Sequence, residues 1–254
     1  MTDFVKIFQF ETDTGLGKSA RLGLIVLQTD QTIEYEFKII FNKFEDIALY
    51  ASRIPNAMEV SSSTLRRMEK DLPRAAKLLP AQFDFDVIGY ACTSGATLIG
   101  EERIEGLLQN VHPKAAITNP ITASKASLKA TGIKKIALLT PYPADVTLEM
   151  QANFERSGFQ IKALATFDES NDFTVARIKS DSILEAITDI GLQKDCDGVF
   201  VSCTSLRALK IIQDAEAIIG KPVISSNQAL AWHMTRLAGV GEQLENVGSL
   251  FRVA

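Results

Sequence analysis

The chain has 254 residues, of which 46% are hydrophobic and 23% are charged, and its formal net charge is −4 at pH 7. This ordinary globular composition provides enough apolar material for a sizeable core, so it excludes a disordered, collagen-like or disulfide-scaffold protein. The length suits one large domain or two domains of about 100–150 residues each. The mildly acidic balance gives no reason to expect nucleic acid or an anionic membrane as a partner.

The first residues lack the basic and apolar regions of a secretory signal. No apolar run approaches the roughly 18–20 residues that a membrane-spanning helix needs. The three cysteines are sparse and odd in number. Together these features predict free thiols in a reducing, cytoplasmic compartment.

Short apolar runs alternate with longer amphipathic stretches, a rhythm that is typical of parallel sheets flanked by helices. The runs are β-branched or aliphatic and mostly lack polar alternation, as expected for strands covered on both faces. We expect strands at residues 22–27, 87–91, 115–118, 136–139, 161–165, 198–202 and 222–225. Apolar periodicity and capping residues predict helices over residues 144–157, 174–190, 205–219 and 226–237.

A weak internal repeat links two of the expected strands. Residues 86–94 read DVIGYACTS, and residues 197–205 read DGVFVSCTS. In each segment an Asp precedes an apolar strand, Cys-Thr-Ser follows it, and a helix-like stretch comes next. The repeat predicts two similar α/β units, which place Cys92 and Cys203 at the C-terminal ends of corresponding strands.

Ligands of open α/β sheets bind beyond the C-terminal ends of the strands, so the two cysteines are candidates for chemistry. At a strand-to-helix turn, helix N–H groups would lower the pKa of a thiol and suit a substrate carboxylate. Two thiols flanking one small anion suit proton transfer on opposite faces of a carbon, or thiolate addition with protonation by the other thiol. The hydroxyl groups that follow them are candidate donors to the ligand: Thr93, Ser94, Thr204 and Ser205.

A single free cysteine is most often a small buried hydrophobe, and for either residue alone that interpretation is favoured. The repeated context favours function for the pair. Cys196 lacks this context and is interpreted as structural. Nucleotide, zinc and serine-triad chemistries lack their motifs, because there is no complete P-loop, G-x-G-x-x-G, Cys/His cluster or G-x-S-x-G.

From about residue 21 to residue 239, the chain resembles the aspartate/glutamate racemase superfamily. Within it, the resemblance is to maleate cis–trans isomerases, arylmalonate decarboxylases and the isomerase-like proteins of ectoine-utilisation clusters. The segments that carry it are GYACTSG at 89–95, TPY at 140–142, SCTSLR at 202–207 and PVISSNQA at 222–229.

The resemblance implies an α/β fold of two pseudo-symmetric subdomains with the active site between them, and no metal or organic cofactor. We expect the first subdomain to comprise residues 1–118 plus 222–254, and the second to comprise residues 119–221. The family's habit of forming dimers or larger assemblies implies a homo-oligomer.

The resemblance also implies roles for individual residues. Cys92 matches the cysteine that adds to a double bond, and Cys203 matches its acid/base partner. Tyr142 matches a tyrosine that hydrogen-bonds a substrate carboxylate, and Asn171 matches a family asparagine. Retention of both cysteines favours a cofactor-independent isomerase or racemase acting on a small carboxylate. The alternatives are an arylmalonate-type decarboxylase that depends mainly on Cys203, and a non-catalytic small-molecule-binding protein.

Asp30 departs from the family pattern, because relatives carry a carboxylate-binding asparagine there. Two like charges about 4 Å apart cost on the order of 4 kcal/mol at an effective dielectric constant of about 20. Asp30 is therefore protonated, points away, or faces an amino or amidine group of the substrate. We favour the last hypothesis, while a turn or helix-capping role is the structural alternative.

Overall fold

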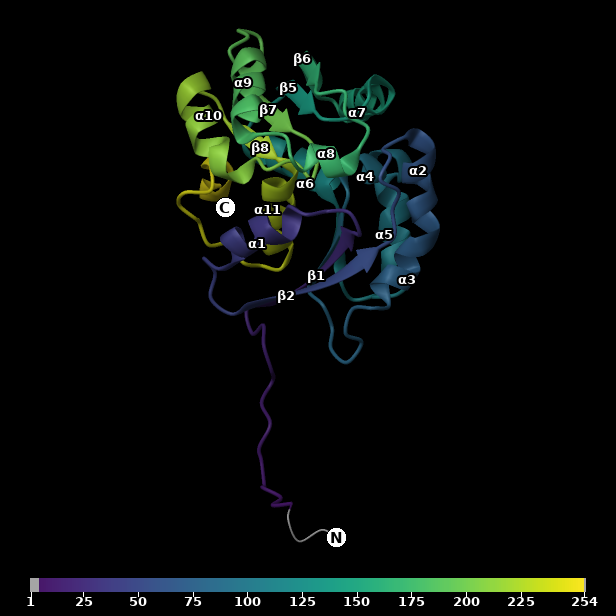
Figure 1. The fold of residues 1–254 in the computed structure, drawn as a ribbon. Coiled ribbons are helices and arrows are strands. Elements are labelled where there is room, and N and C mark those ends of the chain that lie inside the picture. The colour runs from purple at the N-terminus through teal and green to yellow at the C-terminus, as the bar shows by residue number, and fades with distance from the viewer. Residues whose placement is uncertain (1–4, 254) are drawn as a thin grey trace.

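The computed structural model describes residues 5–253 and contains two four-stranded parallel sheets, each with helices packed against it (Figure 1). The strand orders are β2-β1-β3-β4 and β6-β5-β7-β8, so the two sheets repeat one topology. The strands of the first sheet are β1 (Ala20–Leu27), β2 (Ile47–Ile54), β3 (Val87–Ala91) and β4 (Ala116–Thr118). Those of the second are β5 (Lys135–Thr140), β6 (Gln160–Thr166), β7 (Gly198–Val201) and β8 (Val223–Ser225).

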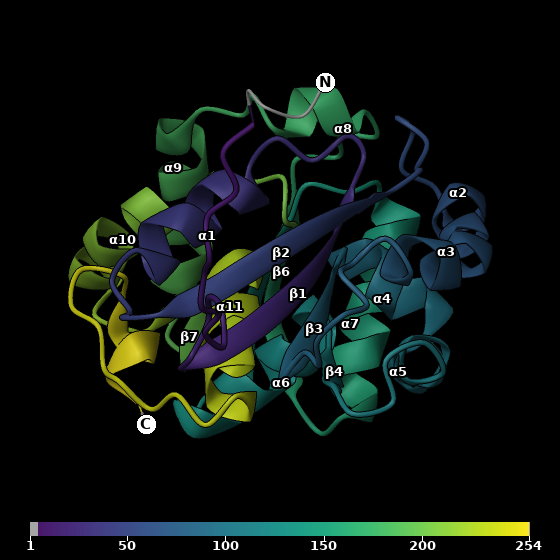
Figure 2. The same ribbon diagram turned by 90° about the horizontal axis from the view of Figure 1, so that it is seen from below.

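Helices cover the faces of both sheets, and Figure 2 shows α3, α4 and α5 to one side of the first sheet and α1 and α11 to the other. In the first half of the chain the helices are α1 (Ile33–Phe41), α2 (Ser62–Arg67), α3 (Leu72–Ala76), α4 (Thr93–Ile99), α5 (Glu101–Gln109) and α6 (Pro120–Ala130). In the second half they are α7 (Ala144–Arg156), α8 (Asp172–Val175), α9 (Ser180–Gly191), α10 (Ile212–Ile219) and α11 (Ser226–Leu237). Three short 3-10 helices are η1 (Met68–Asp71), η2 (Leu209–Ile211) and η3 (Ser249–Arg252).

All seven expected strands are present, and β2 is the strand that the prediction missed. β2 lies at the edge of its sheet, pairs only with β1 within that sheet, and buries only Ser52 and Ile54 among its residues. An edge strand of this kind needs no continuous apolar run. The first half of β2 is nevertheless apolar from Ile47 to Ala51, so the sequence did carry a strand signal there that the prediction left out.

Two expected helices are shorter than predicted. The segment 205–219 begins with a turn and becomes helical only at η2 and α10. The segment 174–190 is interrupted, because α8 ends at Val175 and α9 starts at Ser180. Apolar periodicity continues through the interruption, and no glycine or proline marks it. The first of these non-helical stretches contributes Ser205 to the lining of the pocket described below.

The predicted boundary at residue 222, where the chain was expected to return to the first subdomain, lies before β8 of the second sheet. β8 pairs in parallel with β7, so residues 223–225 belong to the second sheet. α11, which follows at once, packs against α1, β3, β4 and α6. We propose a first subdomain that resumes at residue 226 rather than at residue 222.

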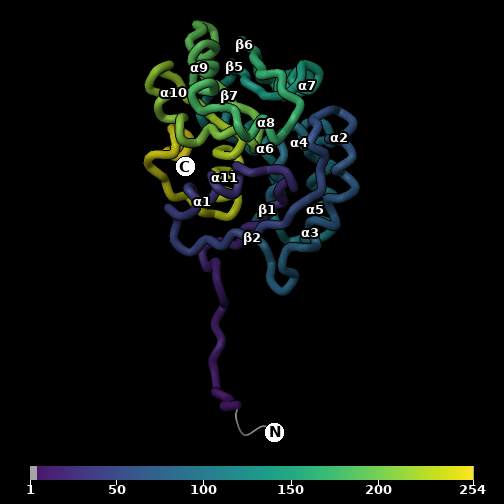
Figure 3. The backbone as a smooth tube through the Cα atoms, viewed as in Figure 1, coloured from purple at the N-terminus to yellow at the C-terminus, as the bar shows by residue number. Residues whose placement is uncertain are grey.

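The N-terminal segment, residues 5–16, runs away from the rest of the molecule (Figures 1 and 3). Ile7, Phe8 and Phe10 are exposed along it. The folded part of the chain begins where Gly17 approaches β2. There, Arg21 donates hydrogen bonds to the carbonyls of Leu16 and Thr14. No helix within residues 5–253 is long and apolar enough to cross a bilayer.

Candidate active site

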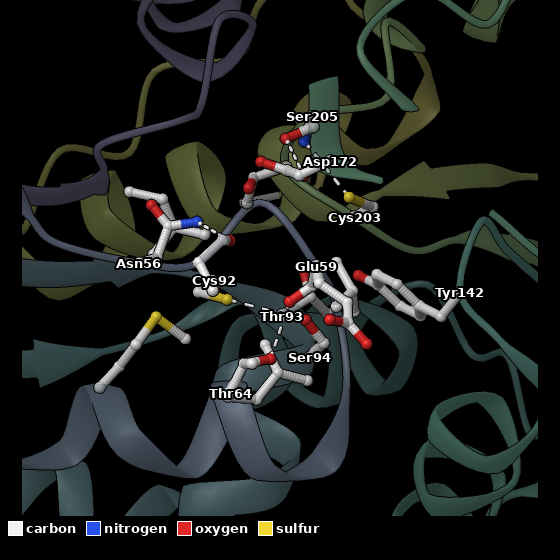
Figure 4. A pocket seen from close by; sticks show the side chains of 16 residues that line it. Asn56, Glu59, Thr64, Cys92, Thr93, Ser94, Tyr142, Asp172, Cys203 and Ser205 are labelled. Carbon is white, nitrogen blue, oxygen red and sulfur yellow. Dashed lines mark hydrogen bonds between the residues drawn. The ribbon is translucent and has the colours of Figure 1, made fainter. Parts of the chain in front are cut away.

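A pocket lies where the C-terminal ends of the two sheets meet, and both repeat cysteines line it (Figure 4). Cys92 directly follows β3, and Cys203 follows β7 after one residue. The lining comes from both units: Leu27, Asn56, Ala57, Glu59, Val60, Thr64, Leu65, Met68, Cys92, Thr93, Ser94, Tyr142, Asp172, Cys203, Thr204 and Ser205. The structure thus brings together both cysteines, all four predicted hydroxyl residues and Tyr142.

Cys92 caps the N-terminus of α4. Its Sγ accepts a hydrogen bond from the backbone N–H of Gly95 at 3.2 Å and lies 3.7 Å from Ser94 Oγ. Burial nevertheless raises the pKa of the Cys92 thiol to about 11, outweighing the N–H and hydroxyl groups that lower it. The lowering of the Cys92 pKa that was expected from helix N–H groups is therefore present but smaller than the effect of burial.

Gly95 allows Tyr90 and Cys92 to approach each other beneath α4. A Cβ atom at position 95 would lie 2.6 Å from the Tyr90 hydroxyl and 2.9 Å from Cys92 Sγ. Both distances are shorter than real Cβ atoms tolerate. Glycine at this position therefore keeps the Cys92 sulfur and the Tyr90 hydroxyl next to each other.

Cys203 sits in a turn rather than at a helix N-terminus, which corrects the second half of the predicted repeat. Its φ angle is +102°, a conformation that costs a non-glycine residue about 1–3 kcal/mol and recurs at functional sites. Ser205 donates its backbone N–H to Cys203 Sγ at 3.4 Å. Burial first, and then the negative charge of Asp172, raises the pKa of Cys203 well above its ordinary value.

Ser226 connects the two cysteine segments, and the sequence analysis missed it. Its hydroxyl oxygen accepts hydrogen bonds from the Thr93 hydroxyl at 2.9 Å and from the Cys203 backbone N–H at 3.0 Å. Ser226 is fully buried at the start of α11. One side chain therefore holds the residue after Cys92 and the backbone of Cys203 in a common arrangement.

Tyr142 lies on the pocket wall that the second unit provides. Its hydroxyl accepts a hydrogen bond from Ser202 Oγ at 3.3 Å. Burial raises the pKa of Tyr142 well above its ordinary value, so the phenol keeps its proton and can donate it. This agrees with a side chain that donates to a ligand, the role expected for Tyr142.

Asp172, not Asn171, presents its side chain to the pocket. Asn171 is exposed and caps α8 by accepting from the N–H of Thr174. Asp172 is buried, and its two carboxylate oxygens accept hydrogen bonds from the hydroxyls of Thr29 and Ser205. Asn171 and Asp172 are adjacent polar residues at the start of a helix, and the sequence alone does not indicate which of them is buried.

Asp30 lies outside the pocket lining, which contradicts the prediction that it faces the substrate. Its Oδ1 accepts the backbone N–H groups of Thr32 and Ile33, so the structural alternative, capping at the start of α1, is the observed role. Its Oδ2 is buried without a hydrogen-bond partner. Burial raises the pKa of Asp30, and the two N–H donors oppose the shift.

A short strap of chain joins the two units beside the pocket. The backbone N–H of Val60 donates to Ser170 O at 2.7 Å, and the N–H of Asp172 donates to Met58 O at 3.0 Å. Between these bonds, Glu59 pairs with Asn171 in an isolated antiparallel bridge. Glu59 is exposed yet lines the pocket, so this strap, formed by residues 58–60 and 170–172, lies at the pocket rim.

Cys196 lies apart from the pocket lining, as its lack of context indicated. Its thiol is buried, contacts carbonyls at the end of α9 and accepts a hydrogen bond from Lys221 at 3.2 Å. Cys196 therefore has packing and hydrogen-bonding partners of its own and serves as an internal reference for the two pocket thiols.

Comparison with known proteins identifies the family. The profile of the arylmalonate decarboxylase family matches residues 59–251. The chain belongs to this family. A maleate isomerase from Alcaligenes faecalis is 26% identical over 247 residues, which cover 92% of this chain and 96% of that protein. The arylmalonate decarboxylase of Bordetella bronchiseptica is 29% identical over 136 residues, covering 53% of this chain and 57% of that enzyme.

Solved structures confirm the fold. The maleate cis–trans isomerase of Nocardia farcinica, in a variant with a covalently bound succinylcysteine intermediate, has a TM-score of 0.86 with this chain at 22% identity. The match covers 92% of this chain and 98% of that enzyme. The two-unit α/β architecture and the likeness to maleate isomerases and arylmalonate decarboxylases are therefore confirmed. Membership of the ectoine-utilisation subgroup stays a prediction.

Proposed function

We propose that this chain is a two-cysteine isomerase or racemase that acts on a small carboxylate without a cofactor. The observation that carries the proposal is the placement of Cys92 and Cys203, which come from different units, on the lining of one pocket. Maleate isomerases among the relatives, and the covalent cysteine intermediate named for one of them, support it.

In a cis–trans isomerisation, Cys92 acts as a thiolate and Cys203 as a thiol. The Cys92 sulfur forms a bond to one alkene carbon, and the electron pair of the double bond takes the proton of Cys203 at the neighbouring carbon. Rotation about the new single bond converts the cis arrangement of the substituents into the trans arrangement. The Cys203 thiolate then removes a proton from that carbon, the double bond re-forms and the carbon–sulfur bond breaks.

In a racemisation, one thiolate removes the proton from the α-carbon and the opposite thiol donates its own to the other face. Both reactions start from one thiolate and one thiol, so the cysteine pair must first lose one proton to solvent. Because the pKa values of both thiols are raised, we expect this loss to accompany substrate binding rather than precede it.

We assign the substrate carboxylate to the Tyr142 side of the pocket. The Tyr142 hydroxyl retains its proton and is available to donate, while the hydroxyls of Thr93, Ser94 and Thr204 provide further polar contacts on the lining. These residues would hold the reacting carbon between the two sulfur atoms, where orientation supplies much of the rate acceleration.

An arylmalonate-type decarboxylase is the second candidate, and the family profile and the Bordetella relative favour it. In that reaction a carboxylate leaves as carbon dioxide and the resulting carbanion takes a proton from Cys203, so Cys92 is dispensable. The Cys92→Ala variant therefore separates the two candidates.

The test is proton NMR in deuterated buffer, with wild type, Cys92→Ala, Cys203→Ala and Cys196→Ala, the last as a matched control. The panel contains maleate, aspartate, methylmalonate, arylmalonates and ectoine-type compounds. The proposal predicts isomerisation or α-deuteration that both pocket variants lose and Cys196→Ala keeps. Carbon dioxide release that survives Cys92→Ala would establish the decarboxylase instead. Turnover that survives both variants, or none with any compound, would favour a different mechanism or a binding protein.

A further inference from the structure

The Asp172 carboxylate is buried, and none of residues 5–253 forms an ion pair with it. Its relative exposure is 5%. Its hydrogen-bond donors are neutral hydroxyls, those of Thr29 and Ser205. Buried charges in proteins are normally paired, so this carboxylate is available to a positive partner other than the described residues.

The rest of the lining increases the negative charge. Glu59 adds a second acid at the rim, and none of the described residues that line the pocket is lysine, arginine or histidine. Arg53 donates to the carbonyls of Leu27 and Asp30 and pairs with Glu34. A ligand with two carboxylates would therefore place one of them against uncompensated negative charge.

We infer that the substrate carries a cationic nitrogen, as an ammonium or amidinium group, and that Asp172 binds it and determines specificity. The inference rests on the proposed function, since it takes this pocket as the substrate site. The carboxylate of the substrate points to Tyr142, and its cationic group points to Asp172 at the other side of the sulfur pair (Figure 4). A compound that is anionic at both ends is then a poor substrate.

The same charge couples substrate binding to the thiols. The negative charge of Asp172 raises the pKa of both Cys92 and Cys203. A cation that binds Asp172 offsets this charge and favours a thiolate beside it. The protein would thus form its reactive thiolate only with a substrate of the right charge in place.

The test uses three isosteric ligands that differ in charge at one end: succinate, its neutral half-amide succinamate, and its half-amidine 3-amidinopropanoate. Their affinities are measured by titration calorimetry on Cys203→Ser, which keeps the pocket and removes turnover. We expect the amidine to bind at least about tenfold more tightly than succinate, because the two terminal groups differ in the sign of their charge beside Asp172. In Cys203→Ser with Asp172→Asn, this preference should fall by at least about tenfold.

Two matched variants locate the effect. Glu169→Gln removes one charge from the same loop at a residue outside the pocket lining and should leave the preference unchanged. Glu59→Gln neutralises the exposed rim acid, so it should reduce the preference less than Asp172→Asn does. Thermal melting of every variant checks that the fold is retained, and Glu59→Gln still tests the acidic pocket if Asp172→Asn fails to fold.

The inference is overturned if succinate binds as tightly as the amidine, or if none of the three ligands binds at millimolar concentration. It is also overturned if Asp172→Asn leaves the preference for the amidine unchanged. Where Asp172→Asn does not fold, an unchanged preference in Glu59→Gln overturns it. These results are independent of turnover. The two-cysteine mechanism would be rejected if turnover followed by NMR survives the loss of either cysteine. If the charge preference is preserved in that case, the role of Asp172 still holds.

Discussion

The backbone N–H of Cys203 donates to the hydroxyl of Ser226 across 3.0 Å, and this bond holds a strained residue in place. Ser226 is the first residue of α11, which packs on the first sheet, whereas Cys203 follows the second sheet. The same oxygen accepts from Thr93, next to the other thiol. The relative position of the two sulfur atoms therefore depends on this buried hydroxyl.

Replacing Ser226 by alanine should impair both stability and activity. The change leaves the buried Cys203 N–H without an acceptor, at a cost of about 1–3 kcal/mol in the free energy of unfolding. Urea denaturation measures this loss, and kcat/KM should fall at least about tenfold as the sulfur pair loses its alignment. Ser182→Ala, on the exposed face of α9, is the control and should change neither value.

Gly95→Ala should disturb the Cys92 site, because the new methyl group meets the Tyr90 hydroxyl and the Cys92 sulfur. We expect a loss of activity and a free energy of unfolding that falls by about 1–3 kcal/mol, as is typical of overpacking. Gly106 lies within α5 with open space around it, so Gly106→Ala should instead increase the free energy of unfolding by about 0.4–1 kcal/mol. Equal effects of the two substitutions on urea denaturation would contradict the proposed contact.

Glu36 should make the protein less stable as pH rises through neutrality. It is buried, accepts from Leu209 N–H and Asn227 Nδ2, and burial raises its pKa from 4.5 to about 7. Between these two values the folded chain holds a proton that the unfolded chain has lost. The destabilising effect is thus absent below pH about 4.5 and complete above pH about 7, where it reaches about 3 kcal/mol.

Urea denaturation of wild type and Glu36→Gln from pH 5 to pH 8 measures this effect. The variant should lose most of the slope of unfolding free energy against pH over that range, whereas Glu102→Gln, on the exposed side of α5, should keep it. A wild-type curve that is flat between the two pH values would show that Glu36 is ionised at no cost. Asp30, whose pKa is also raised by burial, contributes with the same sign.

The free protein should resist alkylation of Cys92 and Cys203 at neutral pH. Only the thiolate reacts readily, and the pKa of Cys92 is about 11, with that of Cys203 also raised. Iodoacetamide labelling followed by peptide mass spectrometry should show Cys92 reacting before Cys203 as pH increases, because burial and the negative charge of Asp172 together raise the pKa of Cys203 further than that of Cys92. Preferential labelling of Cys203 would contradict this order, and Cys92→Ser and Cys203→Ser confirm the peptide assignment.

Hydrophobic pattern was sufficient to predict every strand described here except β2, because central parallel strands such as β3 and β7 are buried on both faces and leave continuous apolar runs. The Cys-Thr-Ser repeat likewise located both thiols in the pocket. The burial of a polar or ionisable side chain, by contrast, has no local signature in the sequence. The Asp30 and Asp172 environments, and the raised thiol pKa values, arise from contacts between segments far apart in the chain.

The turn at Cys203 illustrates the same limit. Residues 203–208 have no helix-breaking residue, yet contacts from Ser226 and from Asp172 through Ser205 hold them out of a helix. Such tertiary contacts override local propensity. The second unit therefore repeats the sequence of the first at Cys-Thr-Ser without repeating its capped helix.

The strap has a consequence for the timing of catalysis. Opening of the strap at Glu59 breaks the two backbone hydrogen bonds that Val60 and Asp172 donate. Those amide protons then become open to exchange with solvent deuterium during each opening. Under conditions in which every opening leads to exchange, the exchange rate of these two amides equals the opening rate, and no substrate that enters by this route can be turned over faster.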